Sequence, residues 1–566
     1  MKKIIKLILC AFLSINLSAC SKQKEIADTI VYGNIYLSEN NYVEAMAIKD
    51  GKIICLGTTE EVDEYLSYNT AIADYSDNFI MAGFIDGHVH AYVDAENSAG
   101  FILSDCESQT EEEYLKVIKE YIEANPDKEI YEGFGWLDSA FIGGSPTAAA
   151  LDEICSDKPI FIKSEDCHSC WCNTKMMEMA GITSSTSDPI GGKIEKDSNG
   201  NPSGCFRDTA MDELIKPYVP VYSVDEYVEL LKTEQDKLLK YGYTAYNDVI
   251  IDPSSAANIC EAYYNLDKAG LLKVDVNVSI LINNSENYIE DLNKVIELKE
   301  KYDTENFKIT DIKIFMDGIV ESETAYVSVP YENSDSVGAD RWPNTNRLYD
   351  LVKRINDAGL VAHFHAIGDA AITKALDAIE YARKNSTNNS VRNCITHFQM
   401  ISDNDIKRMK QLNVIAVANL GWAPSTNSEL GNENIEEINV GKQRNEAMYP
   451  FKTIIDEGII TSYATDYPAG PVDYSIYNIE AGVTRQILNY SSTLRNGAEC
   501  ISIYEALKCM SENGAYQLGR ENEIGKLEVG YEADFIVLNE DITTVEPKSL
   551  VYDVHILETY TDGIKR

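Results

Sequence analysis

Short apolar segments alternate with amphipathic ones through most of the chain, and this alternation constrains the fold more than any other feature. The first kind has the length of a buried strand, and the second has the 3.6-residue period of a helix. We predict strands at Phe79–Ile85, Tyr243–Asp248, Val274–Ile282, Asp311–Met316, Leu360–His365, Arg392–His397, Val414–Ala418 and Ile459–Ala464. We predict helices between them at Val224–Tyr241, Tyr288–Tyr302, Leu348–Ala358 and Ala370–Lys384.

Strands followed by helices are typical of parallel βα units, and their number suits a closed, TIM-like (β/α)8 barrel. We therefore expect an α/β fold with a barrel domain over residues 79–519. The alternation breaks between about 100 and 220, where strand candidates at Glu129–Phe134 and Pro159–Lys163 lie among clusters of Gly, Ser and Pro. We interpret this part as an inserted subdomain beside the barrel mouth.

Both ends of the chain outside the barrel contain short β segments. We predict strands at Thr29–Leu37, Tyr42–Ile48, Lys52–Leu56 and Ala533–Leu538. The turn Asp50-Gly51 between alternating apolar residues is a strong hairpin signal. We expect a small β-sandwich domain composed of residues 29–78 and 520–566.

The first twenty residues have the pattern of a secretory signal. Three lysines among the first six residues precede an apolar run at Leu7–Leu13, which is too short for a membrane span. The following sequence LSAC, ending at Cys20, resembles the lipobox of bacterial lipoproteins. This resemblance implies a signal peptide at residues 1–19, a lipid on Cys20 and a tether at 20–28. The mature protein would then be extracytoplasmic and anchored to the bacterial membrane; an uncleaved anchor is the alternative.

The formal net charge of −43 argues against a nucleic-acid partner, because a polyanion would be repelled. We interpret this charge as a solvated acidic surface, with weak steering of cationic substrates as the alternative. Apart from Cys10 and Cys20, the cysteines have no regular spacing, and we expect no disulfide among them.

His88 and His90 lie two residues apart where the first predicted barrel strand ends, in the sequence GFIDGHVH. Residues i and i+2 of an extended strand point to the same face, so both imidazoles can reach one ion. On a helix, the same spacing would separate them by about 200°. The pair therefore predicts a metal site at this end of the strand.

Further residues able to carry chemistry fall in or just after later predicted strands. These are Lys313, His365, His397 and Asp466. A single histidine at a strand end is more often structural than a ligand. Four of the seven histidines at such ends favour one shared metal site, because neutral imidazoles and carboxylates bind zinc well.

The order HxH, then Lys, His, His and Asp, resembles the amidohydrolase superfamily of metal-dependent hydrolases. The sequence around these residues resembles that of its amidohydrolase-3 branch, which includes N-substituted formamide deformylases. The matching segments are GFIDGHVH (83–90), DCHSCWCN (166–173), IKIFMDG (312–318), HAIGDAA (365–371), TDYPAGP (465–471), AGVTR (481–485) and GKLEVGYEADFIVL (525–538). The resemblance covers nearly the whole mature chain.

This resemblance implies a centre of two divalent ions, with zinc as the expected metal. A metal ion lowers the pKa of bound water to about 7 and polarises a carbonyl group. The implied reaction is hydrolysis of a non-peptide C–N bond in a small-molecule amide, N-acyl amine or N-formyl amine by a metal-activated hydroxide. Asp466 would act as general base. The implied ligands are His88, His90 and Asp466 for one ion, His365 and His397 for the other, and a carboxylated Lys313 as the bridge.

Two other functions remain open. A deaminase or a cyclic-amide hydrolase could use the same barrel. Single-metal deaminases of this superfamily are expected to carry a glutamate three residues after the fifth-strand histidine, where this chain has Gly368. The other possibility is a lipoprotein that binds a solute without turnover. Such a protein should lack at least one of the metal-ligating residues, and none of them is missing. The sequence leaves the oligomeric state open, including a homo-oligomer.

Two residues near these motifs have more than one interpretation. Lys313 could form an ion pair with Asp311 or Asp317 instead of being carboxylated. His363 could compete with His365 as a ligand, or it could face away beside the substrate.

Three further residues are candidates for substrate binding. His168 lies between Cys167 and Cys170, but the chain has no second CxxC pair at the spacing of a structural zinc site. The resemblance implies instead that His168 approaches the substrate from the insert. Trp136, in the sequence GFGW, and Asp317 are candidates for the pocket wall.

Overall fold

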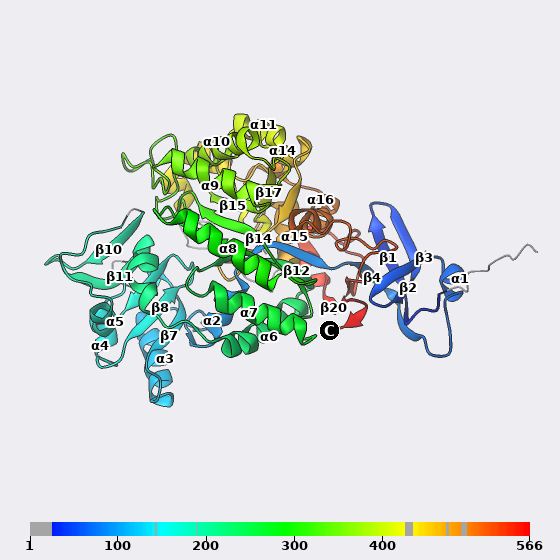
Figure 1. Ribbon diagram of the computed structural model, residues 1–566, viewed down its shortest axis with the longest axis horizontal. Helices are drawn as coiled ribbons and strands as arrows, with labels where there is room; N and C mark the ends of the chain where they lie inside the picture. The colour runs from blue at the N-terminus through cyan, green and yellow to red at the C-terminus, as the bar shows by residue number, and fades with distance from the viewer. Residues whose placement is uncertain (1–24, 142–143, 190, 425–433, 471–474, 488–494) are drawn as a thin grey trace, which may run out of the picture.

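Three sheets follow one another along the long axis of the molecule (Figure 1). The insert lies at one end, the barrel in the middle, and a sheet made from the two terminal parts of the chain at the other. No helix in the described part of the chain is long and apolar enough to cross a membrane. The computed structural model describes residues 25–566 except 142–143, 190, 425–433, 471–474 and 488–494, so the predicted signal segment and Cys20 lie outside it.

Eight strands form the barrel: β5 (Phe84–Val89), β12 (Tyr243–Ile251), β13 (Asp275–Leu281), β14 (Phe307–Phe315), β15 (Val361–Ala366), β16 (Cys394–His397), β17 (Ile415–Ala418) and β18 (Thr461–Tyr463). They pair in this order, and every neighbouring pair is parallel. Beyond the strand ends, the Asp466 backbone N–H donates to the His88 carbonyl oxygen at 3.0 Å, so the last strand meets the first. The predicted α/β barrel is therefore confirmed.

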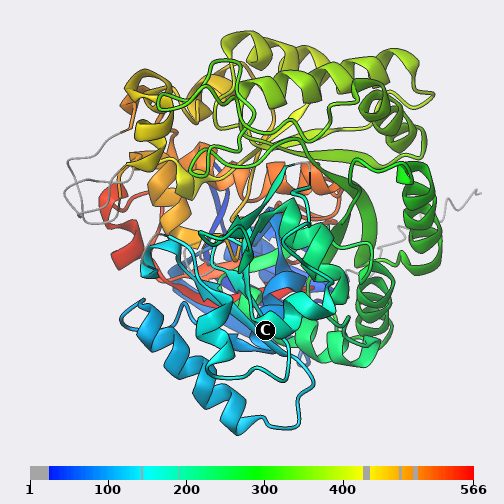
Figure 2. The ribbon, with the colours of Figure 1, turned by 90° about the vertical axis from the view of Figure 1, so that its left-hand side faces the viewer.

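Helices pack around the outside of this barrel (Figure 2). The capping box of α6 shows how the sequence starts one of them, because the Ser223 hydroxyl and the Glu226 carboxylate each accept the other residue's backbone N–H. Leu231 and Leu238 of α6 are buried, whereas Glu229 is exposed. The helices that follow the strands include α6 (Val224–Lys240), α7 (Ala256–Lys268), α8 (Tyr288–Tyr302), α9 (Thr345–Asp357), α10 (Asp369–Asn385) and α11 (Asp403–Leu412).

The segment predicted as the first barrel strand belongs to two sheets. Its first part ends β4 (Ala71–Ala82), which pairs antiparallel with β19 (Phe535–Leu538). Its second part begins β5, which pairs with β12. The chain changes sheets at Gly83, where a Cβ atom would lie 2.3 Å from the side chain of Thr244. Strand β5 therefore begins at Phe84, because no larger residue than glycine fits this crossing.

Strands from both ends of the chain share one seven-stranded sheet, in the order β21-β20-β19-β4-β1-β2-β3. Its remaining strands are β1 (Thr29–Ser38), β2 (Asn41–Lys49), β3 (Lys52–Gly57), β20 (Ile556–Thr561) and β21 (Ile564–Lys565). Alternating side chains bury both faces: Ile35 and Val537 belong to one apolar cluster, and Ile30 and Ala47 belong to another.

The insert contains a mixed six-stranded sheet with its own apolar core around Trp136 and Trp171. In Figure 2 the insert faces the viewer and the barrel lies behind it. This arrangement places the insert against the barrel end that carries the predicted site. The strands pair in the order β10-β11-β9-β8-β7-β6: β6 (Phe101–Ile102), β7 (Tyr131–Trp136), β8 (Ile160–Ser164), β9 (Ser169–Cys172), β10 (Gly192–Lys196) and β11 (Pro202–Asp208).

Candidate metal centre

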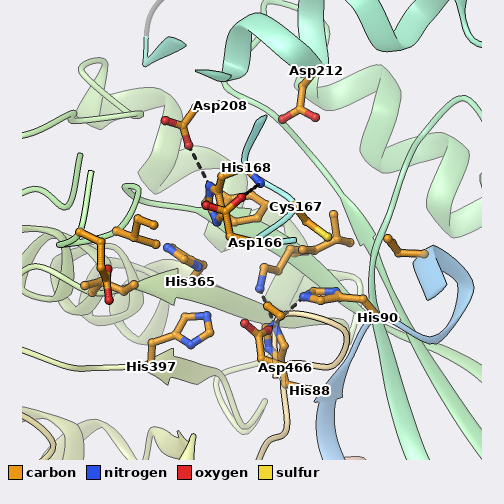
Figure 3. A pocket seen from close by; sticks show the side chains of 18 of the residues that line it. His88, His90, Asp166, Cys167, His168, Asp208, Asp212, His365, His397 and Asp466 are labelled. Carbon is orange, nitrogen blue, oxygen red and sulfur yellow. Dashed lines mark hydrogen bonds and ion pairs between the residues drawn. The ribbon is translucent and has the colours of Figure 1, made fainter. Parts of the chain in front are cut away.

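A cavity of about 490 Å³ lies between the carboxyl ends of the barrel strands and the insert. Apolar side chains such as Leu281, Phe315 and Trp422 form part of its wall, and the insert contributes His168 and Asp208 (Figure 3). All six predicted metal ligands line it: His88, His90, Lys313, His365, His397 and Asp466. Strand ends far apart in the sequence therefore meet at one cavity, as parallel barrels require.

His88, His90 and Asp466 form the first ligand group. Oδ1 of Asp466 lies 3.0 Å from Nε2 of His88 and 3.0 Å from Nε2 of His90. Each of the three buried residues offers one possible metal-ligand atom, and these three atoms lie within 4.8 Å of one another. Figure 3 shows the three side chains converging on one point. This group can bind a divalent ion with little rearrangement.

The residues around the first ligand group hold it in place. The Asp86 carboxylate accepts the backbone N–H of His88 at 3.0 Å and that of Thr465 at 3.2 Å, and it also accepts the Thr465 hydroxyl. It thereby joins the end of β5 to the loop that follows β18. Asp466 has a φ of 62°, a left-handed conformation that is unfavourable for residues other than glycine. Tertiary contacts must therefore stabilise this backbone conformation.

His365 and His397, the predicted second ligand group, lie side by side with ring centroids 4.5 Å apart. The Trp422 ring stacks on His397 with centroids 5.1 Å apart and an interplanar angle of 3°. His365 Nε2 lies 3.2 Å from the Gly318 carbonyl oxygen, and His397 Nδ1 lies 2.9 Å from Asn419 Oδ1. These contacts fix the orientation of both rings.

The same contacts show which ring nitrogens are free to bind a metal. A carbonyl oxygen only accepts hydrogen bonds, so the nitrogen facing it carries the proton and the other keeps its electron pair. His90 Nδ1 donates to the Val249 carbonyl oxygen at 3.1 Å, which directs Nε2 toward Asp466 in the first ligand group. By the same argument His397 keeps Nε2 free and His365 keeps Nδ1 free. Such outer hydrogen bonds are characteristic of metal-binding histidines.

The protonation states also suit a metal. Burial lowers the pKa of His88 and of His365 well below the ordinary value, and it lowers that of His397 to about 3. Burial alone would raise the pKa of Asp466, but His397, His88 and His90 hold it well below its usual range. These three imidazoles are therefore neutral and the Asp466 carboxylate is ionised, which is the form in which such groups ligate.

Lys313 lies beside the first ligand group, with Nζ 3.1 Å from Nε2 of His88. Its side chain is fully buried, and burial lowers its pKa to about 7 although Asp466 opposes this. Within the described residues it forms no salt bridge with Asp311, because that carboxylate contacts His363 and Asn247 instead. The alternative of an ordinary ion pair with Asp311 or Asp317 is thus unsupported.

His168 reaches the cavity from the insert. Its Nδ1 lies 2.8 Å from Asp208 Oδ1, and Arg341 lies 3.3 Å from the same oxygen. Burial lowers the pKa of His168, but Asp208 outweighs this and raises it to about 9. Figure 3 shows His168 on the insert side of the cavity and His365 on the barrel side. The insert therefore places a cationic imidazole opposite the metal ligands.

Trp136 and Asp317 do not line the cavity. Trp136 is buried in the core of the insert and donates to the Ile162 carbonyl oxygen at 3.0 Å. The Asp317 carboxylate accepts three backbone N–H groups in the loops beside His365, at distances of 2.8 to 3.1 Å. The prediction that these two residues contact the substrate gains no support from these contacts.

Sequence reasoning overlooked three residues that shape the site. Asp86 lies two residues before His88, so the same-face spacing was a usable signal. Asn419 directly follows β17, and its position at a strand end was a second signal. Trp422 had none, since its contact with His397 depends on the short 3-10 helix η4 (Leu420–Trp422) that follows β17.

Buried neutral imidazoles and a carboxylate at the carboxyl end of a parallel barrel define a metal-dependent hydrolase. The chain belongs to the amidohydrolase family, whose model Amidohydro_3 matches residues 72–564. The sequence-based assignment to the amidohydrolase-3 branch is thereby confirmed. Its chemistry is hydrolysis of carbon–nitrogen bonds with a divalent metal.

Two relatives and one solved structure cover nearly the whole chain. The putative amidohydrolase YtcJ of Bacillus subtilis is 29% identical, over 93% of this chain and 96% of that protein. The N-substituted formamide deformylase of Arthrobacter pascens is 27% identical, over 94% of this chain and 96% of that protein. A metal-dependent hydrolase from Pyrococcus horikoshii shares the fold, with a TM-score of 0.73 and 24% identity over 92% of this chain and 99% of that one.

Proposed function

We propose that this protein hydrolyses N-acyl or N-formyl amines, or other small non-peptide amides, at a centre of two zinc ions bridged by a carboxylated Lys313. The observation that carries this proposal is the arrangement of the four ligand histidines. Each has one ring nitrogen hydrogen-bonded to a group outside the cavity, and all four line the same cavity as Asp466 and the buried amine of Lys313.

The proposed count of two ions is supported by the presence of two sets of ligand histidines in the cavity that Lys313 also lines. Lys313 Nζ is 3.1 Å from His88 in the first group. It lines the same cavity as His365 and His397 of the second group. A bridging ligand from this position would supply one oxygen to each ion.

Carboxylation of Lys313 is chemically reasonable because its amine is partly neutral at physiological pH. With the pKa lowered to about 7, the free electron pair of Nζ can attack carbon dioxide. The amine and carbon dioxide form a carbamate, and one proton is released to solvent. The product is an anion in place of a buried cation, and a metal centre would stabilise it.

When bound, the metal supplies a Lewis acid and lowers the pKa of a water molecule. Asp466 is placed to accept the proton of the attacking water, since within the described residues its Oδ2 has no hydrogen-bond partner. It can then donate that proton to the leaving nitrogen. His168 can donate a hydrogen bond to the bound substrate, because Asp208 keeps its imidazole protonated.

Substrate screening with metal-reconstituted protein tests this function most directly. The panel should contain N-formyl amines, N-acetyl amines, lactams and cyclic imides, with release of the amine or ring opening as the readout. Turnover of open-chain amides is expected. Turnover confined to lactams or cyclic imides would replace the proposal with cyclic-amide hydrolysis.

A deaminase remains the weaker candidate. The 5-methylthioadenosine/S-adenosylhomocysteine deaminase of Thermoanaerobacter pseudethanolicus is 27% identical, but over only 26% of this chain. Gly368 stands where the expected deaminase glutamate would be, and a Cβ atom there would lie 2.0 Å from the Tyr326 carbonyl oxygen. No side chain fits at this position, so the structure favours amide hydrolysis.

We also propose that the protein is exported and anchored to the membrane by a lipid on Cys20. The lysine-rich start, the apolar run and the LSAC sequence support this proposal. Cys20→Ser should move the protein from the membrane fraction to the soluble extracytoplasmic fraction. Retention of this variant in the membrane would contradict lipid anchoring.

A further inference from the structure

A buried row of polar side chains runs through the barrel interior behind His88. His88 Nδ1 lies 2.8 Å from His363 Nε2 and 3.1 Å from the Thr396 hydroxyl. The Thr396 hydroxyl is itself 2.7 Å from His363 Nε2. At the far end, His363 Nδ1 lies 3.1 Å from Asp311 Oδ2. All four side chains are buried, so no bulk water competes for these contacts.

The carboxylate at the far end determines where the protons lie. Asp311 Oδ2 already accepts the Asn247 amide at 2.9 Å, and it accepts His363 Nδ1 as well. His363 therefore carries its proton on Nδ1, and Nε2 of the neutral ring is an acceptor. His88 Nδ1 is then the donor to His363, and the electron pair of His88 Nε2 faces the first ligand group, where it can accept from Lys313 Nζ 3.1 Å away.

His363 belongs to a deeper layer of the barrel than the cavity. His363 and His365 lie two residues apart on β15, so both point to the barrel interior, but in successive layers. His365 lines the cavity, whereas His363 does not. In register, His363 is paired with Lys313 on β14 and with Cys394 on β16. It is therefore placed to contact a ligand, not to replace one.

The outer partner of His88 differs from those of the other three ligand histidines. His90 and His365 donate to backbone carbonyl oxygens, and His397 donates to an amide oxygen. His88 alone among the four donates to an imidazole that is itself hydrogen-bonded to a carboxylate. Such a polarised acceptor fixes the tautomer more firmly and increases the basicity of the ligand.

We propose that His363 is a positioning residue which, backed by Asp311 and assisted by Thr396, holds His88 as an Nε2 ligand of the first ligand group. The inference rests on the proposed two-ion centre. It predicts that His363 governs the affinity of one ion and leaves the other unaffected, because no such row of described residues reaches His365 or His397.

Zinc affinity of purified protein, measured by chelator competition, tests this role. His363→Leu removes the acceptor, and we expect one of the two zinc equivalents to bind about 10- to 100-fold more weakly. His363→Gln keeps an oxygen that can accept from His88 Nδ1 and should recover most of that affinity. Thr396→Val should give a smaller loss than His363→Leu. The second equivalent serves as an internal control in every variant.

Thermal unfolding of the metal-free variants separates positioning from packing. The proposal is overturned if His363→Leu binds both equivalents as tightly as the wild type. It is also overturned if His363→Gln and His363→Leu both lose zinc affinity to the same extent and both lose stability in the metal-free state to the same extent, relative to the wild type. Asp311, His363 and Cys394 could themselves form a metal-ligand group, and a third zinc equivalent lost with Cys394→Ser would overturn it too. A wild type without stoichiometric zinc would instead refute the proposed function.

Discussion

The two ligand groups of the metal centre differ in how complete they are. In the first, Asp466 already lies 3.0 Å from both His88 and His90. In the second, His365 and His397 are oriented, but no described carboxylate joins them in a close metal-ligand group. The first group can bind an ion by itself, whereas the second would need a further ligand, which in the proposed two-ion centre is the carboxylated Lys313.

This difference shows that one chain can prepare two parts of a site by different means. The first group is assembled by backbone contacts, by Asp86 and by the row behind His88. In the proposed centre, the second would depend on a buried lysine whose charged form is disfavoured by burial. The predictions below test this contrast, beginning with the largest expected effect.

Asp466→Asn, a change in the first ligand group, should abolish most of the turnover. The amide keeps the shape of the side chain but cannot accept a proton from water, so kcat should fall by about 10⁴-fold. Steady-state kinetics with the best substrate of the panel measures this loss, and circular dichroism checks that the fold persists. Activity within tenfold of the wild type would exclude Asp466 as the base.

Lys313→Met should stabilise the metal-free protein. The pKa of Lys313 falls from 10.5 in the unfolded chain to about 7 in the fold, so the unfolded state binds this proton more tightly. The resulting penalty on folding is fully present below pH 7 and is relieved as the pH rises toward 10.5. Removing the amine should therefore stabilise the protein by roughly 5 kcal/mol at most below pH 7.

Urea unfolding of the metal-free protein at several pH values measures this change. The advantage of Lys313→Met over the wild type should shrink between pH 7 and 10.5. Lys163→Met, which removes another lysine of the same cavity, is the matched control. An advantage that does not change with pH would show that the lysine is not destabilised by its charge.

Lys313→Ala should impair turnover by removing the bridging ligand from the incomplete group. We expect kcat/KM to fall by about 100-fold, comparable to the loss of other groups that support a metal site. Added propionate should restore part of the activity, because a free carboxylate can occupy the space of the missing side chain. Lys163→Ala is again the control, and rescue of both variants by propionate would contradict the bridge.

His168→Gln should have the smallest effect. The glutamine keeps hydrogen-bonding capacity but loses the positive charge that Asp208 sustains. KM should rise about tenfold while the metal content stays unchanged, because replacing a hydrogen bond from a charged donor by one from a neutral donor costs about 1.4 kcal/mol. A loss of bound metal in this variant would mean that His168 supports the ligands instead of the substrate.

The strand ends were predictable because polar residues interrupt apolar runs there, and parallel strands in a barrel bring such ends together. All six proposed ligands line the cavity for that reason. The layer in which a residue lies could not be predicted. His363 and His365 share a face of β15, and spacing alone does not show that only His365 reaches the cavity.

Contacts between distant loops were equally hidden. Trp136 has the character of a pocket residue in sequence, but its indole donates to Ile162 inside the core of the insert. Asp317 resembles a site residue, yet its carboxylate is occupied by backbone N–H groups from two loops. The change of sheet at Gly83 is set by its close approach to Thr244, 161 residues further along the chain.

The zinc content of the wild type and of Lys313→Ala, measured by metal analysis after reconstitution, tests the central claim most directly. The contrast between a complete and an incomplete ligand group predicts about two zinc equivalents per chain in the wild type. It predicts one in the variant, held by His88, His90 and Asp466. A single equivalent in the wild type, unchanged by Lys313→Ala, would contradict it.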